Sequence, residues 1–483
     1  MAGRMLKFVD RQREMPDKAA PGERRENWNE IYARFAREKA AGQAGRCSQC
    51  GVPFCQVHCP LHNNIPDWLL LTAEGRLEEA YEVSSATNTF PEVCGRICPQ
   101  DRLCEGNCVI EQSGHGTVTI GAIENYITVT AFENGWVRPI VPAAERAESV
   151  GIIGAGPGGL AAADRLRRHG YQVHVYDRYD RVGGLLIYGI PSFKLEKDVV
   201  ERRARLLADS GVTFHLNVEI GRDVTFAALR EKHDAILIAT GVYKARDVEL
   251  PGSGLGNIVP AMTYLTASNR KGLGDSVPEF DNGALDANGK KVVVIGGGDT
   301  AMDCVRTAIR QGATSVQCLY RRDRDNMPGS QREVTNAEEE GVEFVWQAGP
   351  EAFLGDAGGP VTGVRAHRMR LGVPDATGRQ TPEPVPDSSF TLDADLVVKA
   401  LGFDPEDLPH LFGEPTLAVT RWGTIKAQLT SGATDLPGVY AAGDIVRGAS
   451  LVVWAIRDGR DAADAMHKYI RQRSASNAQA AAE

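Results

Sequence analysis

The chain has 483 residues, of which 42% are hydrophobic and 24% charged, so it has the composition of a globular protein with ample core. Its length suggests about three domains, and its net charge of −9 argues against nucleic acid as a partner. No apolar run reaches the length of about 18 residues that a membrane helix needs, and the N-terminus lacks the apolar core of a signal peptide. We therefore expect a cytoplasmic protein without membrane contact.

The N-terminal region is polar except for an amphipathic stretch at 28–39, which predicts a helix packed against its own domain, with a partner-binding role as the alternative. Short helical patterns with one apolar side follow at 65–71 and 77–83. Eight of the ten cysteines lie between Cys47 and Cys108. In a reducing compartment, such a concentration is more typical of a metal site than of disulfides.

The cysteine spacing divides these eight thiols into two groups of four. The first group follows C-x2-C-x4-C-x3-C-P, and the second follows C-x3-C-P-x4-C-x3-C. Two zinc ions are an alternative, but zinc ligands usually pair twice as C-x2-C, and only Cys47 and Cys50 have that spacing. A Cys-Pro ending after three close cysteines instead resembles bacterial ferredoxin runs, in which the last cysteine serves the other cluster. We therefore predict two [4Fe–4S] clusters.

The ferredoxin analogy also assigns the thiols to these two clusters. The ligands of cluster 1 are Cys47, Cys50, Cys55 and the distant Cys108. The ligands of cluster 2 are Cys59, Cys98, Cys104 and, as the simplest choice of fourth ligand, Cys94.

Residues 149–177 have the pattern of a strand, a glycine turn, a helix and a second strand. Gly154, Gly156 and Gly159 have the spacing of the dinucleotide fingerprint, and Asp177 ends the second strand 18 residues after Gly159. The first glycine makes the turn, the second lets the backbone approach a pyrophosphate, and the third lets the helix pack on the strand. The helix N-terminus then holds the phosphates, while Asp177 suits a ribose hydroxyl.

The chain then repeats this pattern. A strand at 291–295 leads into a second glycine turn, a helix and a strand at 315–320, and each unit closes with an apolar strand and a glycine turn, at 234–241 and 395–402. In place of an acid, the second unit has Arg321 and Arg322, whose guanidinium groups suit a 2′-phosphate. The alternative is a solvated run of charges. We therefore predict NADPH in the second unit and FAD in the first.

These units resemble the two-dinucleotide-domain flavoprotein reductases, in which an NADPH domain is inserted into an FAD domain. The resemblance covers about 149–470 and implies an α/β fold with two Rossmann-like domains, here preceded by an α-helical iron–sulfur domain. It also implies that the loop at 183–191 passes along the flavin, and that Gly443-Asp444 returns to it before a helix at 451–470. The predicted domains are a helical domain at 1–145, an FAD domain at 146–285 and 405–473, an NADPH domain at 286–404 and a disordered tail at 474–483.

The residues that this resemblance and the motifs assign to FAD are Gly154, Gly156, Pro157, Gly158, Gly159, Asp177, Arg178, Gly184, Leu185, Val218, Thr240, Gly241, Gly443, Asp444 and Ser450. The residues assigned to NADPH are Gly296, Gly297, Gly298, Asp299, Thr300, Ala301, Arg321, Arg322 and Gly402. Many relatives reduce a disulfide beside the flavin, but Cys304 and Cys318 form no close pair and are expected to be small core residues.

The whole chain resembles the small (β) subunits of bacterial NADPH-dependent glutamate synthases, from Arg46-Cys47-x-x-Cys50 through Tyr320-Arg321-Arg322 to Ala441-Ala442-Gly443-Asp444. The resemblance implies a hetero-oligomer in which electrons from NADPH pass through FAD and the clusters to a large (α) subunit. That subunit carries FMN and makes glutamate from 2-oxoglutarate and glutamine. The similar domain of dihydropyrimidine dehydrogenase uses a downstream glutamine ligand, so Glu124 is a rival to Cys94. A stand-alone NADPH reductase for a ferredoxin or small-molecule acceptor is the alternative function.

Overall fold

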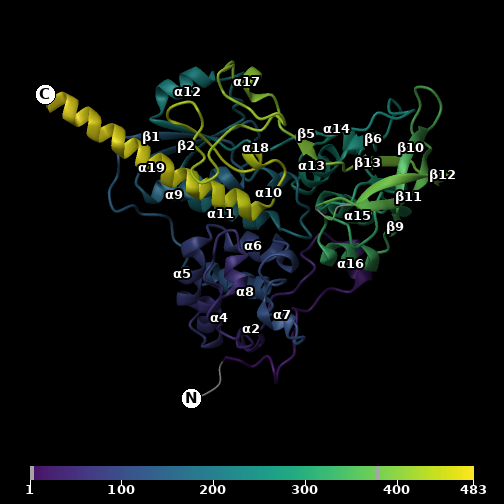
Figure 1. The fold of residues 1–483 in the computed structure, drawn as a ribbon, viewed down its shortest axis with the longest axis horizontal. Helices are drawn as coiled ribbons and strands as arrows, with labels where there is room; N and C mark the ends of the chain where they lie inside the picture. The colour runs from purple at the N-terminus through teal and green to yellow at the C-terminus, as the bar shows by residue number, and fades with distance from the viewer. Residues whose placement is uncertain (1–4, 377, 379, 483) are drawn as a thin grey trace.

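The computed structural model describes residues 5–376, 378 and 380–482, and it contains a helical domain below two α/β units (Figure 1). The α/β architecture with a preceding helical domain confirms the predicted fold class. None of the helices among these residues is long and apolar enough to cross a membrane.

Short helices around one apolar core form the helical domain. Trp68, Ile123 and Ile127 are fully buried in this core. These helices are α2 (Arg37–Ala44), α3 (Phe54–Val57), α4 (Ile65–Ala73), α5 (Leu77–Thr87), α6 (Pro91–Ile97), η1 (Gln100–Arg102), α7 (Val109–Gln112) and α8 (Ile120–Glu133). The first helix, α1 (Pro21–Glu26), packs instead on the second α/β unit, where Arg24 pairs with Glu339 at 2.6 Å.

The predicted helix at 28–39 is wrong, because only its last part, from Arg37, is helical. The preceding segment is an extended arm that pairs with an earlier stretch: the Ala19 N–H donates to the Ile31 carbonyl, and the Ala33 N–H to the Asp17 carbonyl. These bonds satisfy the backbone in place of helical ones. Ile31 and Phe35 are nevertheless buried, whereas Trp28 is exposed, so the apolar pattern indicated burial in part but not conformation.

The first unit is a parallel five-stranded sheet in the order β15-β4-β1-β2-β3. Its strands are β1 (Ser149–Ile153), β2 (Gln172–Asp177), β3 (Thr213–Leu216), β4 (Ala235–Ile238) and β15 (Val439–Ala441). Its helices are α9 (Pro157–Arg168), α10 (Leu185–Tyr188), α11 (Lys197–Asp209), α12 (Phe226–Lys232), α17 (Leu408–Leu411), α18 (Asp444–Arg447) and α19 (Val452–Ala482). Because β15 joins β4 after the whole second unit has intervened, the second unit is an insertion in the first.

The second unit has a parallel sheet in the order β6-β13-β7-β8-β9 and an antiparallel sheet in the order β10-β11-β12. Its strands are β6 (Ile258–Pro260), β7 (Lys291–Ile295), β8 (Ser315–Tyr320), β9 (Glu343–Trp346), β10 (Ala348–Leu354), β11 (Gly363–Pro374), β12 (Gln380–Asp393) and β13 (Leu396–Lys399). Its helices are α13 (Ala261–Gly272), α14 (Pro278–Asp281), α15 (Asp299–Arg310) and α16 (Gln331–Glu339).

Two boundaries differ from the sequence prediction. The two chain crossings between the units pair as β5 (Lys244–Ala245) and β14 (Phe403–Asp404), and β6 belongs to the second sheet. The second unit therefore begins well before residue 286. At the other end, α19 continues to Ala482 through the predicted disordered tail, because this segment is rich in alanine, the strongest helix former.

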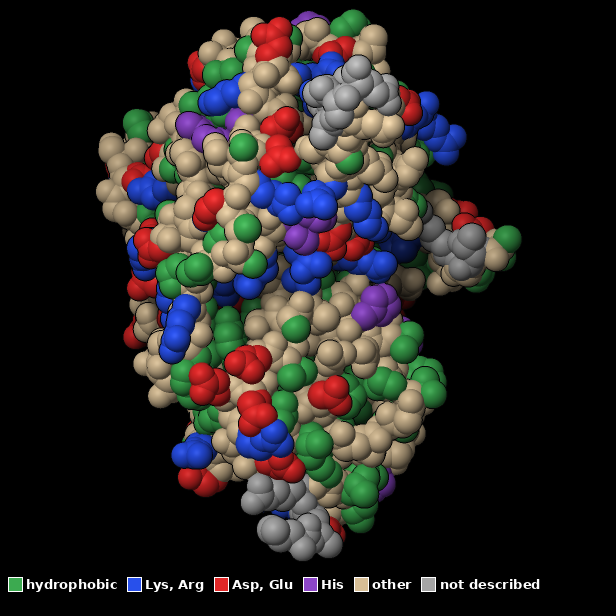
Figure 2. All heavy atoms as spheres, turned by 90° about the vertical axis from the view of Figure 1, so that its left-hand side faces the viewer, with side chains coloured by type: hydrophobic (Ala, Val, Ile, Leu, Met, Phe, Trp, Pro, Cys, Tyr) green, Lys and Arg blue, Asp and Glu red, His purple; other side chains and the backbone are tan. Residues whose placement is uncertain are grey.

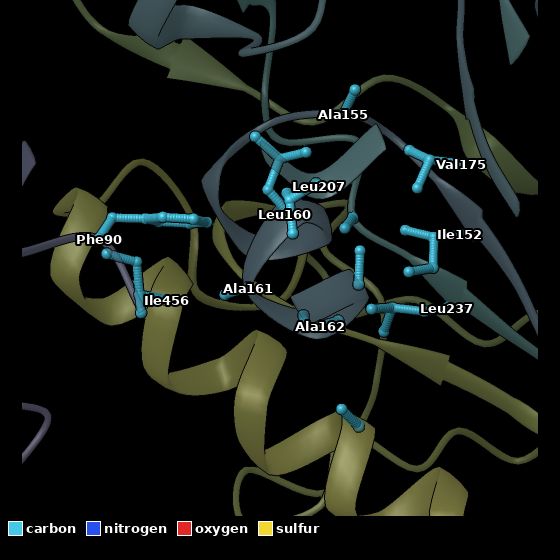
Figure 3. Packing of buried hydrophobic residues seen from close by; sticks show 14 of the residues in the cluster. Phe90, Ile152, Ala155, Leu160, Ala161, Ala162, Val175, Leu207, Leu237 and Ile456 are labelled. Atoms are coloured by element: carbon cyan, nitrogen blue, oxygen red, sulfur yellow. The ribbon is translucent and has the colours of Figure 1, made fainter. Parts of the chain in front are cut away.

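One apolar core joins the helical domain to the first unit (Figure 3). Phe90 precedes α6 and lies in the same buried cluster as Ile456 of α19, a helix that packs on α9. The side chains of Glu92 and Arg203 form a buried two-bond ion pair between α6 and α11, with N–O distances of 2.6 and 2.9 Å. On the face in Figure 2, Lys and Arg side chains form a band where the helical domain meets the first unit. The cysteine domain is thus fixed against the first nucleotide unit.

Candidate nucleotide and iron–sulfur sites

The glycines of the first turn divide their roles as the fingerprint predicts. Gly154 has φ +109°, and a Cβ there would collide with the Ala239 carbonyl; a Cβ on Gly159 would collide with the Gly154 carbonyl. These two positions need glycine for packing. A Cβ on Gly156 would meet nothing within 4 Å, so this glycine faces open space at the start of α9.

Asp177 is held in place at the end of β2. Its side chain is only 8% exposed, and its two carboxylate oxygens accept hydrogen bonds from the N–H groups of Ala155 (2.7 Å) and Tyr179 (2.9 Å). Burial raises its pKa, and the two N–H groups oppose that shift. The carboxylate is therefore oriented by the glycine turn itself.

Two adjacent cavities, of about 510 and 670 Å3, meet at this turn; we call them together the first nucleotide cavity. Both are lined by Gly154, Asp177, Thr240 and Tyr243. The Thr240 hydroxyl oxygen is buried and has no hydrogen-bond partner among the described residues. An unsatisfied buried hydroxyl is costly unless a ligand satisfies it, so the cavity fits a polar dinucleotide such as FAD.

Thirteen of the fifteen residues predicted for FAD line this cavity. The exceptions are Gly159, which packs under the turn, and Gly184, where a Cβ would lie 2.9 Å from the Gly156 Cα. Tyr243 also lines both parts of the cavity and was not predicted, because its position three residues after Thr240 matches no motif spacing.

Arg178 and Asp444 lie in different parts of the cavity. Arg178 forms a 2.9 Å ion pair with Glu406, and its guanidinium lies 5.1 Å from the centre of the Tyr243 ring. Asp444 begins α18, where burial raises its pKa to about 6 although the Ser450 N–H lowers it. The segment after the inserted unit thus contributes to the cavity from both sides.

In the second glycine turn, as in the first, two glycines are required by close packing and one faces open space. Gly296 has φ +149°, and a Cβ there would collide with the Ala400 carbonyl, while a Cβ on Gly297 would collide with the Tyr320 ring. Gly298, at the start of α15, faces open space as Gly156 does. Asp299 opens the helix, and its carboxylate accepts a hydrogen bond from the Ser330 N–H (2.9 Å). Thr300 and Ala301 follow in the first turn of α15, and Gly402 follows β13.

The charged side chains after β8 differ in whether they already have hydrogen-bond or ion-pair partners. Asp323 accepts two hydrogen bonds within its own turn, and Arg324 pairs with Glu338 at 2.7 Å. Arg321 is exposed, and one terminal nitrogen of Arg322 is buried without a hydrogen-bond partner among the described residues. Guanidinium donors without partners at this position favour the predicted role in binding a phosphate over the alternative of a solvated run of charges.

The predicted ligands of cluster 2 lie together. Cys59, Cys94, Cys98 and Cys104 line one cavity of about 410 Å3. Glu124 lines it too, so both rival fourth ligands meet the other three thiols. One carboxylate oxygen of Glu124 accepts hydrogen bonds from Asn63 (3.3 Å), Ser84 (3.4 Å) and Asn88 (3.0 Å), and burial raises its pKa to about 8.

The predicted ligands of cluster 1 form a second group. Burial raises the pKa of Cys47 to about 11 and that of Cys55 to about 12, and the neighbouring thiols Cys50 and Cys108 add to both shifts. Arg46, which sequence reasoning noted only as part of a motif, is fully buried and donates to the backbone carbonyls of Arg11, His115, Gly116 and Thr117. These hydrogen bonds connect the N-terminal segment around residue 11 to the loop at 115–117.

All ten cysteines are free thiols, and Cys304 and Cys318 are buried in the core of the second unit, as expected. Among the residues that the structure describes, no three His, Cys, Asp or Glu side chains are arranged to hold a single metal ion. The donor chemistry of the two groups, four thiols each, fits iron–sulfur clusters.

Comparison with known proteins gives the family. Residues 24–136 match the family described as dihydropyrimidine dehydrogenase domain II, 4Fe-4S cluster, and residues 148–459 match pyridine nucleotide-disulphide oxidoreductase. The chain is 68% identical over 480 residues to the glutamate synthase [NADPH] small chain of Azospirillum brasilense, covering 99% of both chains. It is 45% identical over 466 residues to the provisionally named oxidoreductase AegA of Escherichia coli (strain K12), covering 95% of this chain and 70% of that one.

The fold is shared with a solved structure of Mycobacterium tuberculosis FprA in complex with NADPH. The TM-score is 0.58 and the identity 20%, over 69% of this chain and 86% of that chain. The 4Fe-4S family match favours iron–sulfur over zinc for the cysteine domain. The chain therefore belongs to the family of NADPH-dependent glutamate synthase small chains, and it is an NADPH-dependent oxidoreductase with an iron–sulfur domain.

Proposed function

We propose that this chain is the NADPH-oxidising subunit of a cytoplasmic glutamate synthase. FAD occupies the first nucleotide cavity, NADPH binds the second unit, and two [4Fe–4S] clusters occupy the two thiol groups. Electrons leave to a large (α) subunit that carries FMN and makes glutamate from 2-oxoglutarate and glutamine. The full-length similarity to a small chain of glutamate synthase supports this partner.

The proposal rests above all on one helix turn whose residues line two cavities. Leu451 and Val452 line the first nucleotide cavity, and the next residue, Val453, lines the cavity of the cluster 2 thiols. The first turn of α19 therefore separates the two cavities. Cys104 and Cys108, from different predicted clusters, are four residues apart. These neighbours support an arrangement in series, with cluster 2 next to FAD and cluster 1 farther along.

The protein's own residues contribute position rather than proton transfer. Bound FAD supplies two-electron acceptance from NADPH and one-electron release, which iron–sulfur clusters require. Asp177 and Thr240 would hold the dinucleotide, Asp444 would orient its far end, and Arg321 and Arg322 would hold the 2′-phosphate of NADPH. Since the rate then depends on orientation, we assign no general acid or base.

A stand-alone NADPH reductase with a ferredoxin or small-molecule acceptor is the second candidate. It is favoured by the similarity to AegA, which is named as an oxidoreductase and is longer than this chain. Affinity purification from the native organism separates the two. Co-purification of a much larger FMN protein supports the glutamate synthase subunit, and its absence together with full turnover on a ferredoxin supports the reductase.

The cofactor content can be tested on the purified chain under anaerobic conditions. Two clusters give about eight iron atoms per chain, and we expect Cys98→Ser to remove about half of them. The matched control is Cys304→Ala, a buried cysteine outside the clusters, which should retain all the iron. A chain that holds FAD but reduces no artificial dye with NADPH would refute the proposed function.

A further inference from the structure

A turn of the helical domain touches the second glycine turn. Within η1, one terminal nitrogen of Arg102 donates to the Pro328 carbonyl (2.6 Å), and the other lies 3.7 Å from the Asp299 carboxylate. The adjacent Asp101 carboxylate accepts a hydrogen bond from the Ser330 hydroxyl (3.4 Å). The segment at 328–330 is itself bound to the turn, since the Gly329 N–H donates to the Gly297 carbonyl (3.0 Å).

This contact places a positive charge next to a negative charge at the start of α15. A helix N-terminus attracts phosphate through its free N–H groups and its dipole. Asp299, however, places a carboxylate in the first turn of this helix, where it would repel a diphosphate. The guanidinium of Arg102 lies beside that carboxylate and offsets its charge.

Arg102 also keeps donors free for a ligand. A guanidinium has five N–H donors in a planar fork. Among the residues that the structure describes, only the two terminal nitrogens of Arg102 have partners, and the one near Asp299 is 3.7 Å away. The Arg102 side chain is 43% exposed. Gly298, the residue before its partner Asp299, faces open space. An anion bound at the start of α15 would therefore find N–H groups of Arg102 that these two contacts do not use.

We propose that Arg102, from the iron–sulfur domain, binds the diphosphate of the pyridine nucleotide and completes the nucleotide site of the second unit. The inference rests on the proposed placement of NADPH in that unit. Because Cys98 and Cys104 flank η1, the same short segment carries cluster 2 ligands and a nucleotide contact. The helical domain is thereby part of the pyridine-nucleotide site as well as of the electron path.

Arg102 and the pair Arg321 and Arg322 are assigned to different phosphates, which makes the roles separable. NADP+ carries both groups, NAD+ carries the diphosphate alone, and 2′-AMP carries the 2′-phosphate alone. Equilibrium binding of each probe to the oxidised, FAD-loaded chain can be measured by calorimetry. We expect Arg102→Ala to weaken NADP+ and NAD+ equally, by about tenfold, the size of one charge-assisted hydrogen bond. Binding of 2′-AMP should not change.

Two variants control for other causes. Ser330→Ala removes the Asp101 contact without changing charge, and Arg76→Ala removes an exposed arginine of the same domain far from this turn; both should bind all three probes normally. Arg102→Lys, which keeps the charge, should restore part of the affinity and show steeper loss with salt.

The outcomes distinguish this inference from the proposed function. Unchanged NADP+ and NAD+ affinity in Arg102→Ala, while the double variant Arg321→Ala with Arg322→Ala loses NADP+ and 2′-AMP, overturns the role of Arg102 and leaves the site in place. Equal weakening by Ser330→Ala also overturns it, because the effect would then come from the domain contact. If neither set of arginines affects NADP+, the placement of the nucleotide in the second unit fails.

Discussion

Phe90 should be a main anchor of the iron–sulfur domain on the first nucleotide unit. It is 1% exposed within the core shared by α6, α9 and α19. A buried aromatic side chain removes roughly 150–250 Å2 from water, which at about 25 cal/mol per Å2 corresponds to about 4–6 kcal/mol. Truncation of buried phenylalanine typically costs about 3–5 kcal/mol. We therefore expect Phe90→Ala to lower the free energy of unfolding by about 4 kcal/mol.

Urea unfolding, followed in parallel by far-ultraviolet circular dichroism and by the visible absorbance of bound iron–sulfur, measures this loss. Trp422→Ala is the control, because it truncates a larger side chain that is 68% exposed, and it should change stability by less than about 1 kcal/mol. Because Phe90 neighbours the cluster 2 thiols, we expect the visible absorbance of Phe90→Ala to bleach at lower urea concentration than in the control. Equal losses in both variants would show that burial in this interdomain core does not hold the domain.

Three further predictions concern the first unit and nucleotide choice. Gly156→Ala should fold normally but retain little FAD after gel filtration, because a Cβ at this position has room only when no ligand is bound. Gly159→Ala should instead lower the stability of the protein, because its Cβ would collide with the Gly154 carbonyl. Equal thermal stability of the two variants would contradict this prediction. Burial lowers the pKa of His233 from 6.5 to about 4, so the native state keeps it neutral while the unfolded state binds a proton. Stability should therefore fall as the pH drops from about 6.5 towards 4, by up to about 3 kcal/mol from this group, and His233→Gln should flatten that fall in urea titrations. Arg321→Ala with Arg322→Ala should reduce the preference for NADPH over NADH by about tenfold or more in steady-state dye reduction; an unchanged preference would refute their role.

The differences from the sequence predictions have a common cause. The stretch at 28–39 has a helical apolar pattern, but before Arg37 its backbone forms hydrogen bonds with an earlier segment, so tertiary pairing overrides local periodicity there. Strand β6 has only three residues and becomes a strand through its pairing with β13. Neither partner lies close enough in sequence for a local pattern to reveal it.

The sequence by itself determined the features that depend on local geometry. A glycine turn between a strand and a helix is required by backbone sterics, and its spacing is visible in the residues of one βαβ unit. Asp177 ends β2, whereas Arg321 directly follows the equivalent strand β8, so the difference between the two units could also be read from the sequence. The cysteine spacing likewise identified the chemistry of the N-terminal domain.

Only the tertiary structure decided which of these groups meet. Cys59 shares a cavity with Cys94, Cys98, Cys104 and Glu124 because α6 and α8 pack together, and the first turn of α19 separates that cavity from the nucleotide cavity. The contact of Arg102 with the second glycine turn joins residues almost two hundred positions apart. Such contacts arise from the packing of whole domains, which follows from the sum of many buried surfaces rather than from any single motif.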